Sequence, residues 1–207
     1  MHNATNPGND DISHAATVIL AEGVVVYPTE TFYGLGAHPM SSKAIEKVYS
    51  IKGRDFKKAL PLIAADQAAA RKATAQWPQA AERLAEAFWP GPLTLILPAT
   101  SLVLPRLHAY TGKIAVRVSS HPIAHALSAA VGGLLISTSA NIAGQPACKS
   151  LAEIPSQLLA RVDGLIDAGE LPGGLPSTLV DLSSDPPRLA RAGRVSWESI
   201  CRLLAVG

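Results

Sequence analysis

The sequence has few cysteines and few charged residues. Its two cysteines, Cys148 and Cys201, have no metal-ligand spacing and form no disulfide framework, which fits a reducing compartment. Charged residues make up only 16% of the chain and apolar residues 48%. This balance argues against disorder and against a coiled coil, because both need many more charges. We therefore expect a globular protein with its own hydrophobic core.

Membrane and export signals are also missing. No apolar run approaches the roughly 18 residues that a membrane-spanning helix needs. The start of the chain, MHNATNPGNDD, lacks the basic and apolar regions of a signal peptide. We expect a cytoplasmic protein without a membrane partner. Residues 1–9 are predicted to be a flexible tail and residues 10–207 a single folded domain.

Several well-known site motifs are absent. There is no GxxxxGK[ST] loop, no GxGxxG after the first expected strand and no GxSxG turn. The six histidines include no HExxH pattern, and His121 and His125 lie on a helix of ordinary composition. The sequence therefore predicts no protein metal site. A nucleotide, if bound, would not be held by a P-loop.

Positive charge is concentrated in one segment. The formal net charge is only +2, yet residues 43–58 hold six basic and two acidic side chains. A local positive field suits an anionic ligand such as a phosphate. Lys52 and Arg54, in the tripeptide KGR, offer a compact charge and a planar fork that together suit a triphosphate. They also fit the end of a helix, where cations complement the helix dipole, so both interpretations stay open.

Helical and strand patterns alternate along the whole chain. This order predicts an α/β domain with one twisted, mixed sheet rather than a regular doubly wound one. Helices are expected at 10–23, 41–52, 68–88 with a break at Pro78, 123–131, 151–159 and 196–204. Strands are expected at 24–27, 60–65, 94–98, 113–118, 134–138, near 165, at 177–182 and near 188.

Polar side chains gather where the expected strands end. The segment YPTETFYGLG, residues 27–36, follows a buried strand, and its Gly34 and Gly36 would let a ligand approach the backbone. STSAN, residues 137–141, follows another strand. Each could bind a polar ligand or could be an ordinary loop rich in capping residues. Arg117 stands inside an apolar strand, so it needs a partner unless it faces outward.

Seven segments in a fixed order resemble one family. They run from about residue 23 to residue 193 and read YPTETFYGLG, KGR, WPGPLT, AVRV followed by HP, STSAN with GQP, PSTLVD, and RAG. In this order they resemble the YrdC-type threonylcarbamoyl-AMP synthases, the TsaC family, in its short single-domain form. Any one of these motifs is weak, whereas the ordered set is specific. The resemblance implies a twisted mixed sheet with a concave, basic cavity, and a catalytic domain over residues 10–207.

The resemblance also implies a reaction. Members of the family use L-threonine, bicarbonate or CO2, and ATP with Mg2+ to make threonylcarbamoyl-adenylate and pyrophosphate. The product feeds the t6A modification at position 37 of tRNA, and a separate transfer complex is then the partner that acts on tRNA. Such an enzyme is a nucleotidyltransferase. Whether this chain also contacts tRNA directly stays open.

Site residues follow from the resemblance, position by position. The expected threonine contacts are Thr31, Arg117 and Ser177, with Arg117 pairing with the amino acid carboxylate. The expected nucleotide contacts are Lys52, Arg54, Lys58, Ser139, Asn141 and Arg191, of which Lys52 and Arg54 neutralise charge during catalysis. Lys113 and Ser137 also match ligand-contacting positions. Two departures from the family pattern are Asp55, where proline is common, and Ala147, which lacks the side chain of an ATP contact.

Two alternative functions stay open, and the first belongs to a different class of protein. The basic segment permits a module that binds tRNA or double-stranded RNA, which predicts salt-dependent RNA affinity and no ATP turnover. The aromatic content of 5% is low for a protein that stacks single-stranded bases. The other alternative is a paralogue of the same fold with a different activity. The intact KGR and SAN elements argue against that paralogue.

Overall fold

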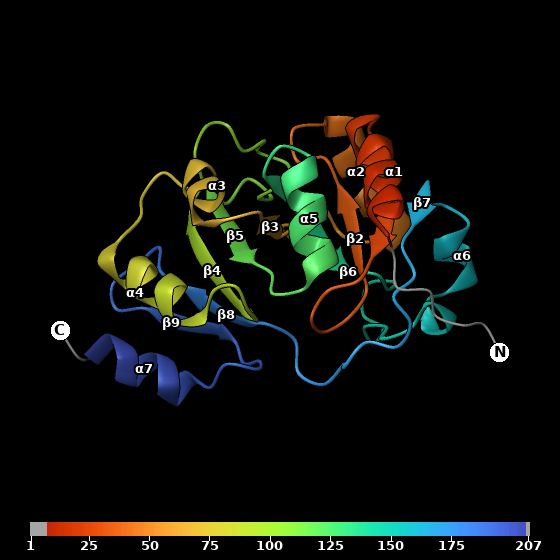
Figure 1. Cartoon of the computed structure of the whole chain (residues 1–207). Coiled ribbons are helices and arrows are strands. Elements are labelled where there is room, and N and C mark those ends of the chain that lie inside the picture. Colours follow the sequence, from red (N-terminus) through yellow and green to blue (C-terminus); the bar gives the residue numbers. More distant parts are fainter. Residues whose placement is uncertain (1–7, 206–207) are drawn as a thin grey trace.

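The structure, a computed structural model, describes residues 8–205. Within them, nine strands form one sheet in the order β7-β1-β2-β6-β3-β5-β4-β8-β9 (Figure 1). The neighbours β1 and β7, β3 and β5, and β4 and β8 run parallel, and the other neighbours run antiparallel. The prediction of an α/β fold with one mixed sheet is thus confirmed. The strands are β1 (Val25–Tyr27), β2 (Gly34–Ala37), β3 (Leu62–Ala64), β4 (Leu93–Pro98), β5 (Lys113–Val118), β6 (Leu134–Ser139), β7 (Gly164–Leu165), β8 (Thr178–Asp181) and β9 (Arg188–Arg191).

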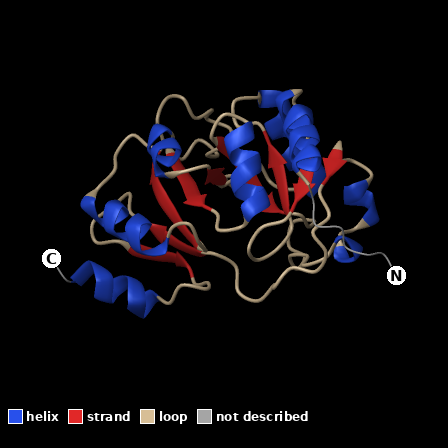
Figure 2. Cartoon of the chain, viewed as in Figure 1, coloured by secondary structure: helices blue, strands red, loops and turns tan. Residues whose placement is uncertain are grey.

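Helices pack on both faces of this sheet (Figure 2). Their bounds are α1 (Asn9–Leu20), α2 (Ser42–Lys52), α3 (Gln67–Lys72), α4 (Gln79–Phe88), α5 (Pro122–Ala130), α6 (Ser156–Leu159) and α7 (Trp197–Ala205), with a 3-10 turn at Leu151–Glu153. Most of these helices and strands match the predicted ranges closely. The predicted tail at residues 1–9 lies mainly outside the described residues, and α1 begins at Asn9.

Three helix predictions need correction. The predicted break at Pro78 within 68–88 is confirmed, since Pro78 is the N-cap of α4, but the gap between α3 and α4 is wider than predicted. The chain before Pro78 bonds instead to the end of β4, with Ala75 N donating to Pro98 O at 2.8 Å. The predicted helix 151–159 is a 3-10 turn and one short helix, since Pro155 has no N–H to continue the ladder. The first helix ends at Leu20, before Gly23, and its cap is Gly8, whose N–H donates to the Asp11 carboxylate at 2.9 Å.

One strand was not predicted from the sequence. Gly34 to Ala37 pairs with both β1 and β6, whereas the glycines were interpreted as part of a loop. Gly36 is needed here because a Cβ at this position would lie 2.9 Å from the Tyr27 ring of the neighbouring strand. The glycine therefore makes room for a buried aromatic side chain of the sheet. Gly34 differs, since it also lines the large cavity described below.

Sheet register explains where that cavity lies. On one face, α1 and α5 cover Val25, Ile63 and Leu135 with apolar side chains. Ile63 is the register partner of Arg117, so the two side chains share this face. Among residues 8–205, no helix covers the part of the face that holds Arg117, and polar side chains line it instead. In Figure 1, α5 lies in front of the middle of the sheet.

Candidate active site

A cavity of about 710 Å3 opens on this uncovered part of the sheet. Alternate residues of three neighbouring strands form its floor, as the two-residue period of a strand requires. They are Lys113, Ala115 and Arg117 from β5, Thr94 and Ile96 from β4, and Leu179 and Asp181 from β8. Further walls come from Thr29, Thr31 and Gly34 near β2 and from Ser137, Ser139 and Asn141 at the end of β6.

The lining residues are net basic. Four cations, Arg54, Lys113, Arg117 and Arg191, face one carboxylate, Asp181. Lys113 Nζ lies 3.3 Å from Asp181 Oδ2, so this pair neutralises itself at one end of the cavity. Of the other three cations, Arg117 is paired with Glu30, as described next. Arg54, Arg191 and the surrounding hydroxyl groups suit an anionic ligand with several oxygen atoms.

Arg117 has a protein partner that the sequence did not indicate. Its Nη1 donates to Glu30, and both side chains are only 10% exposed. Ser119 Oγ donates to the second Glu30 oxygen at 2.5 Å. Burial alone would raise the pKa of Glu30, but Arg117 and these hydrogen bonds outweigh it and hold the pKa below its usual value. Glu30 therefore stays ionised and fixes the guanidinium, which also lines the cavity.

Ser177 links β8 to its neighbours. Its Oγ lies 2.9 Å from Thr94 Oγ1, and Arg191 Nη2 lies 3.2 Å from the same Ser177 oxygen. Arg191 also donates to the Ser177 carbonyl at 2.8 Å. Ser177, Arg117 and Thr31, the three predicted threonine contacts, thus line one cavity.

Arg54 reaches the cavity from the loop after α2. Its Nη1 donates to Thr138 Oγ1 at 3.3 Å and its Nη2 to Ala59 O at 2.9 Å. Its Nε is buried and has no hydrogen-bond partner among the described residues. Burial lowers the pKa of Arg54. An anionic ligand would stabilise a guanidinium at the cavity wall whose hydrogen-bond donors are only partly satisfied.

The same loop is held by contacts of the Phe56 ring with Tyr49 and Arg106. The Arg106 guanidinium lies 4.3 Å from the centre of the Phe56 ring, and Phe56 lies 4.8 Å from the Tyr49 ring. Tyr49 Oη also donates to Lys58 O at 2.8 Å. The backbone that carries Arg54 is therefore fixed on its outer side.

Lys52 and Lys58 do not line the cavity. Lys58 is exposed. Lys52 is only 2% exposed, and its ammonium donates to three oxygens of the segment after β6. Burial, followed by the charge of Arg54, lowers the pKa of Lys52 to about 7. Of the residues predicted from the resemblance, the others all line the cavity, as do Lys113, Ser137 and the methyl side chain of Ala147.

Sequence reasoning missed three polar groups of this region. Glu30 was noticed only as part of a polar segment, and Thr94 and Asp181 were given no role. Alternation within TLILP, residues 94–98, and within STLVDL, residues 177–182, indicates that Thr94 shares a face with Ile96 and that Asp181 shares one with Leu179. Only the register of the sheet places both on the face of Arg117. The sequence carries no comparable signal for the contact between Glu30 and Arg117, because 87 residues separate them.

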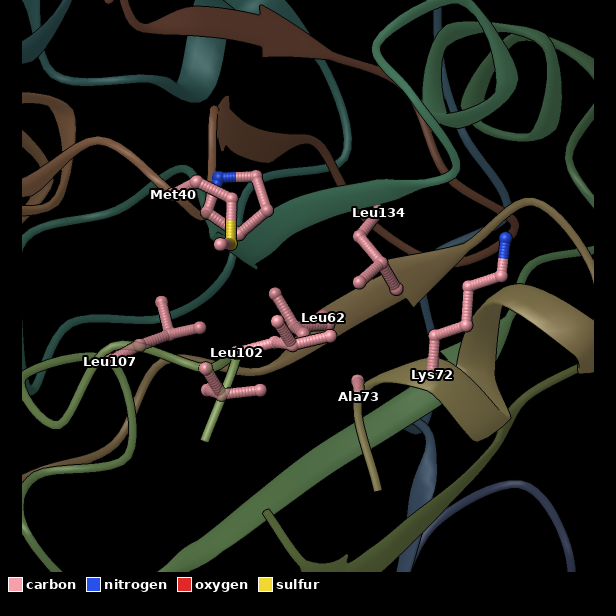
Figure 3. Close-up of a pocket in the computed structure, with 9 residues that line it drawn as sticks. Met40, Leu62, Lys72, Ala73, Leu102, Leu107 and Leu134 are labelled. Atoms are coloured by element: carbon pink, nitrogen blue, oxygen red, sulfur yellow. The ribbon is translucent and has the colours of Figure 1, made fainter. Parts of the chain in front are cut away.

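A second cavity of about 140 Å3 has a different character (Figure 3). Leu62, Leu107 and Leu134 line it, together with Met40 and Leu102, which are 49% and 60% exposed. Figure 3 shows the Lys72 amine turned away from these apolar side chains. Because the lining offers almost no polar group, this cavity cannot orient a charged substrate.

Residues 8–205 lack two further features. Nowhere in this range do three or more His, Cys, Asp or Glu side chains form a group that could hold a metal ion. None of the helices in the same range is long and apolar enough to cross a membrane.

The fold and the cavity define an α/β domain with a basic site on one sheet face. A family model described as telomere recombination, Sua5/YciO/YrdC, matches residues 17–193. This chain belongs to the Sua5/YciO/YrdC family. The resemblance drawn from the ordered motifs is thereby confirmed.

Two curated relatives are named threonylcarbamoyl-AMP synthase. The Bacillus subtilis protein is 36% identical over 91% of this chain and 55% of its own length. The Xanthomonas campestris protein is 36% identical over 91% of this chain and 98% of its own length. The chain therefore spans about half the length of some curated relatives and nearly all of others.

Solved structures agree with this assignment. P. abyssi Sua5 complexed with L-threonine has a TM-score of 0.90 and 34% identity, covering 93% of this chain and 57% of that one. E. coli YciO has a TM-score of 0.84 and 32% identity, covering 93% of this chain and 94% of that one. HypF from T. kodakarensis, at 15% identity and a TM-score of 0.76, is similar in fold alone.

Proposed function

We propose that this chain is an L-threonylcarbamoyladenylate synthase. It would convert L-threonine, bicarbonate or CO2, and Mg·ATP into threonylcarbamoyl-AMP and pyrophosphate, as a nucleotidyltransferase. The observation that carries the proposal is one basic cavity lined by all three predicted threonine contacts and by four of the six predicted nucleotide contacts. Support comes from relatives named for this activity, one of which is matched over 98% of its length. A structural relative complexed with L-threonine adds to this support.

The proposed chemistry needs no covalent enzyme intermediate. The neutral threonine amine bonds to the carbon of CO2 and loses a proton to water, giving a carbamate. A carbamate oxygen then attacks the α-phosphorus of ATP. The bond from that phosphorus to the bridging oxygen breaks, and the electron pair leaves with pyrophosphate. Two anions must approach each other, so charge neutralisation and positioning are the main tasks of the protein.

The cavity residues divide these tasks. Arg117, fixed by Glu30, would bind the threonine carboxylate through its remaining N–H groups. Thr31 and Ser177 offer hydroxyl groups beside it. Arg54 and Arg191 would bind phosphate oxygens, while Ser139 and Asn141 would contact the adenylate. Mg2+ would enter with ATP as part of the substrate.

The product has a mixed anhydride that hydrolyses or acylates an amine. An enzyme that transfers the threonylcarbamoyl group to tRNA is therefore the proposed partner, and the t6A modification is the proposed end point. Direct binding of tRNA by this chain is not needed for the proposed reaction.

Incubation with Mg·ATP, bicarbonate and labelled L-threonine tests the proposal. We expect labelled threonylcarbamoyl-AMP, and pyrophosphate release that stops when threonine is omitted. Pyrophosphate release without threonine would point to a paralogue with another substrate. RNA binding without ATP turnover would support the RNA-binding alternative and contradict the proposal.

A further inference from the structure

The two cations of KGR have different surroundings. Arg54 lines the cavity, whereas Lys52 is 2% exposed and does not line it. Gly53 between them adopts a left-handed conformation with φ of 57° and ends α2. This turn sends the side chains on either side of it in different directions, because the helical geometry stops there. The shared motif therefore does not imply a shared role.

Lys52 binds the segment that follows β6. Its Nζ donates to Ser139 O at 2.5 Å, to Asn141 O at 2.9 Å and to Asn141 Oδ1 at 2.9 Å. The Lys52 carbonyl accepts from Ala143 N at 2.9 Å. Three acceptors match the three N–H donors of an ammonium group. The hydrogen-bonding capacity of the Lys52 side chain is therefore filled by groups of the protein itself. The side chain and the backbone of one residue together hold residues 139–143.

That segment carries two cavity residues. Ser139 and Asn141 both line the cavity. Asn141 Oδ1 accepts from Lys52 and also from Ser139 Oγ at 2.6 Å, and Asn141 Nδ2 donates to Gln145 O at 2.5 Å. These bonds fix the amide plane of Asn141 and tie it to Ser139. Removal of the ammonium would take the donor given above from the Asn141 carbonyl. It would also take one of two donors from Ser139 O and from Asn141 Oδ1, and loss of hydrogen bonds from buried oxygens is costly.

We propose that Lys52 is a positioning residue that sets residues 139–143 in their ligand-binding conformation, acting through Asn141. This inference rests on the proposed function, because it takes the nucleotide to be the ligand of Ser139 and Asn141. It separates Lys52 from Arg54, which acts at the cavity surface. It also predicts that loss of Lys52 weakens all contacts made by the segment, whatever the number of phosphates on the ligand.

Calorimetric titration of the full chain with ATP and with AMP tests this role. We expect Lys52→Met to weaken the binding of both ligands by a similar factor, about fivefold or more. A direct phosphate contact instead predicts a much larger loss for ATP than for AMP. That second result would overturn the proposal.

A double-mutant cycle gives an independent reading. If Lys52 acts through Asn141, then Asn141→Ala should weaken ATP binding clearly in the wild type and by less than twofold in Lys52→Met. Arg54→Ala is the matched comparison, since its loss should persist in the Lys52→Met background. Losses that multiply for Lys52 and Asn141 would contradict the proposal.

Hydrogen exchange measures the segment without any ligand or turnover. We expect faster exchange at the Ala143 amide and across residues 139–145 in Lys52→Met, with α1 and β5 unchanged. Lys52→Arg, which keeps donors and charge, provides a second variant if Lys52→Met does not fold, and it should restore part of the protection. Unchanged exchange across 139–145 would overturn the positioning role. If the wild type bound no ATP, the proposed function would fail, while this measurement would still decide the role of Lys52.

Discussion

Glu30 and Arg117 form an ion pair that joins the segment after β1 to the C-terminal end of β5. The pair is nearly buried, and Ser119 Oγ completes it from the Glu30 side. Arg117 can therefore be kept as a cation inside an apolar strand before any substrate arrives. The partner that the sequence requires for Arg117 is present in the protein itself, and the proposed threonine carboxylate would be a second one.

Glu30→Gln tests this ion pair. We expect a several-fold higher KM for threonine, because Arg117 is no longer held by a carboxylate. Stability should fall by about 1.5–3 kcal/mol, the range for hydrogen bonds to charged groups. Steady-state kinetics and denaturant unfolding measure the two effects. Glu46→Gln is the matched control, since its pair with Arg106 is exposed and 3.7 Å long; equal effects in both variants would contradict the assignment.

The same pair predicts a pH dependence of stability. The pKa of Glu30 is held below 4.5 in the folded protein, so the folded state binds fewer protons than the unfolded state near that pH. Its contribution to stability is present above 4.5 and is lost as the pH falls through the folded-state value. The unfolding free energy of wild type minus that of Glu30→Gln should shrink on acidification. A difference that is flat with pH would show that Glu30 is not the group concerned.

Arg54→Ala should lower threonine-dependent pyrophosphate release at least tenfold, which corresponds to about 1.4 kcal/mol in the barrier. The reason is the loss of the one KGR cation that lines the cavity. Lys57→Ala is the control, because Lys57 has the same charge but is exposed on the same loop. Near-normal turnover by the Arg54→Ala variant would contradict a role for Arg54 in catalysis.

Gly36→Ala tests the packing beneath Tyr27. The new methyl group would meet the Tyr27 ring at 2.9 Å, so we expect a loss of about 1–3 kcal/mol in unfolding free energy, typical of overpacked cores. Gly164→Ala is the control, because its Cβ would meet Val25 at an ordinary 3.5 Å in the same sheet. Comparable losses in the two variants would show that Tyr27 is not the cause.

Local features of the fold were predictable, and long-range ones were not. The Ser41 cap was predicted correctly because its hydroxyl accepts from Ala44 N three residues away, at 3.1 Å. The pattern of residues 113–118 likewise predicted β5 with its observed bounds. Strand β2 was missed because its two glycines are explained by the Tyr27 ring of a neighbouring strand, which a local pattern does not reveal.

The predicted site shows the same contrast between local features, which were predictable, and long-range contacts, which were not. The types and order of its polar segments were readable from the sequence, and seven of the nine predicted contacts line one cavity. Lys52 differs because its surroundings depend on residues 139–143, far away in the chain. Whether these side chains bind threonine and ATP stays a prediction.

The parallel pairing of β4 with β8 has a consequence for synthesis of the protein. Leu93 lies beside Thr178, so Ser177 and Arg191 reach the cavity only after most of the chain has left the ribosome. In a nascent chain that already contains Arg54 and Arg117, the cavity therefore still lacks the part of its wall that β8 and β9 supply. Because a ligand stabilises only the state that binds it, substrate cannot assist folding until β8 and β9 have docked.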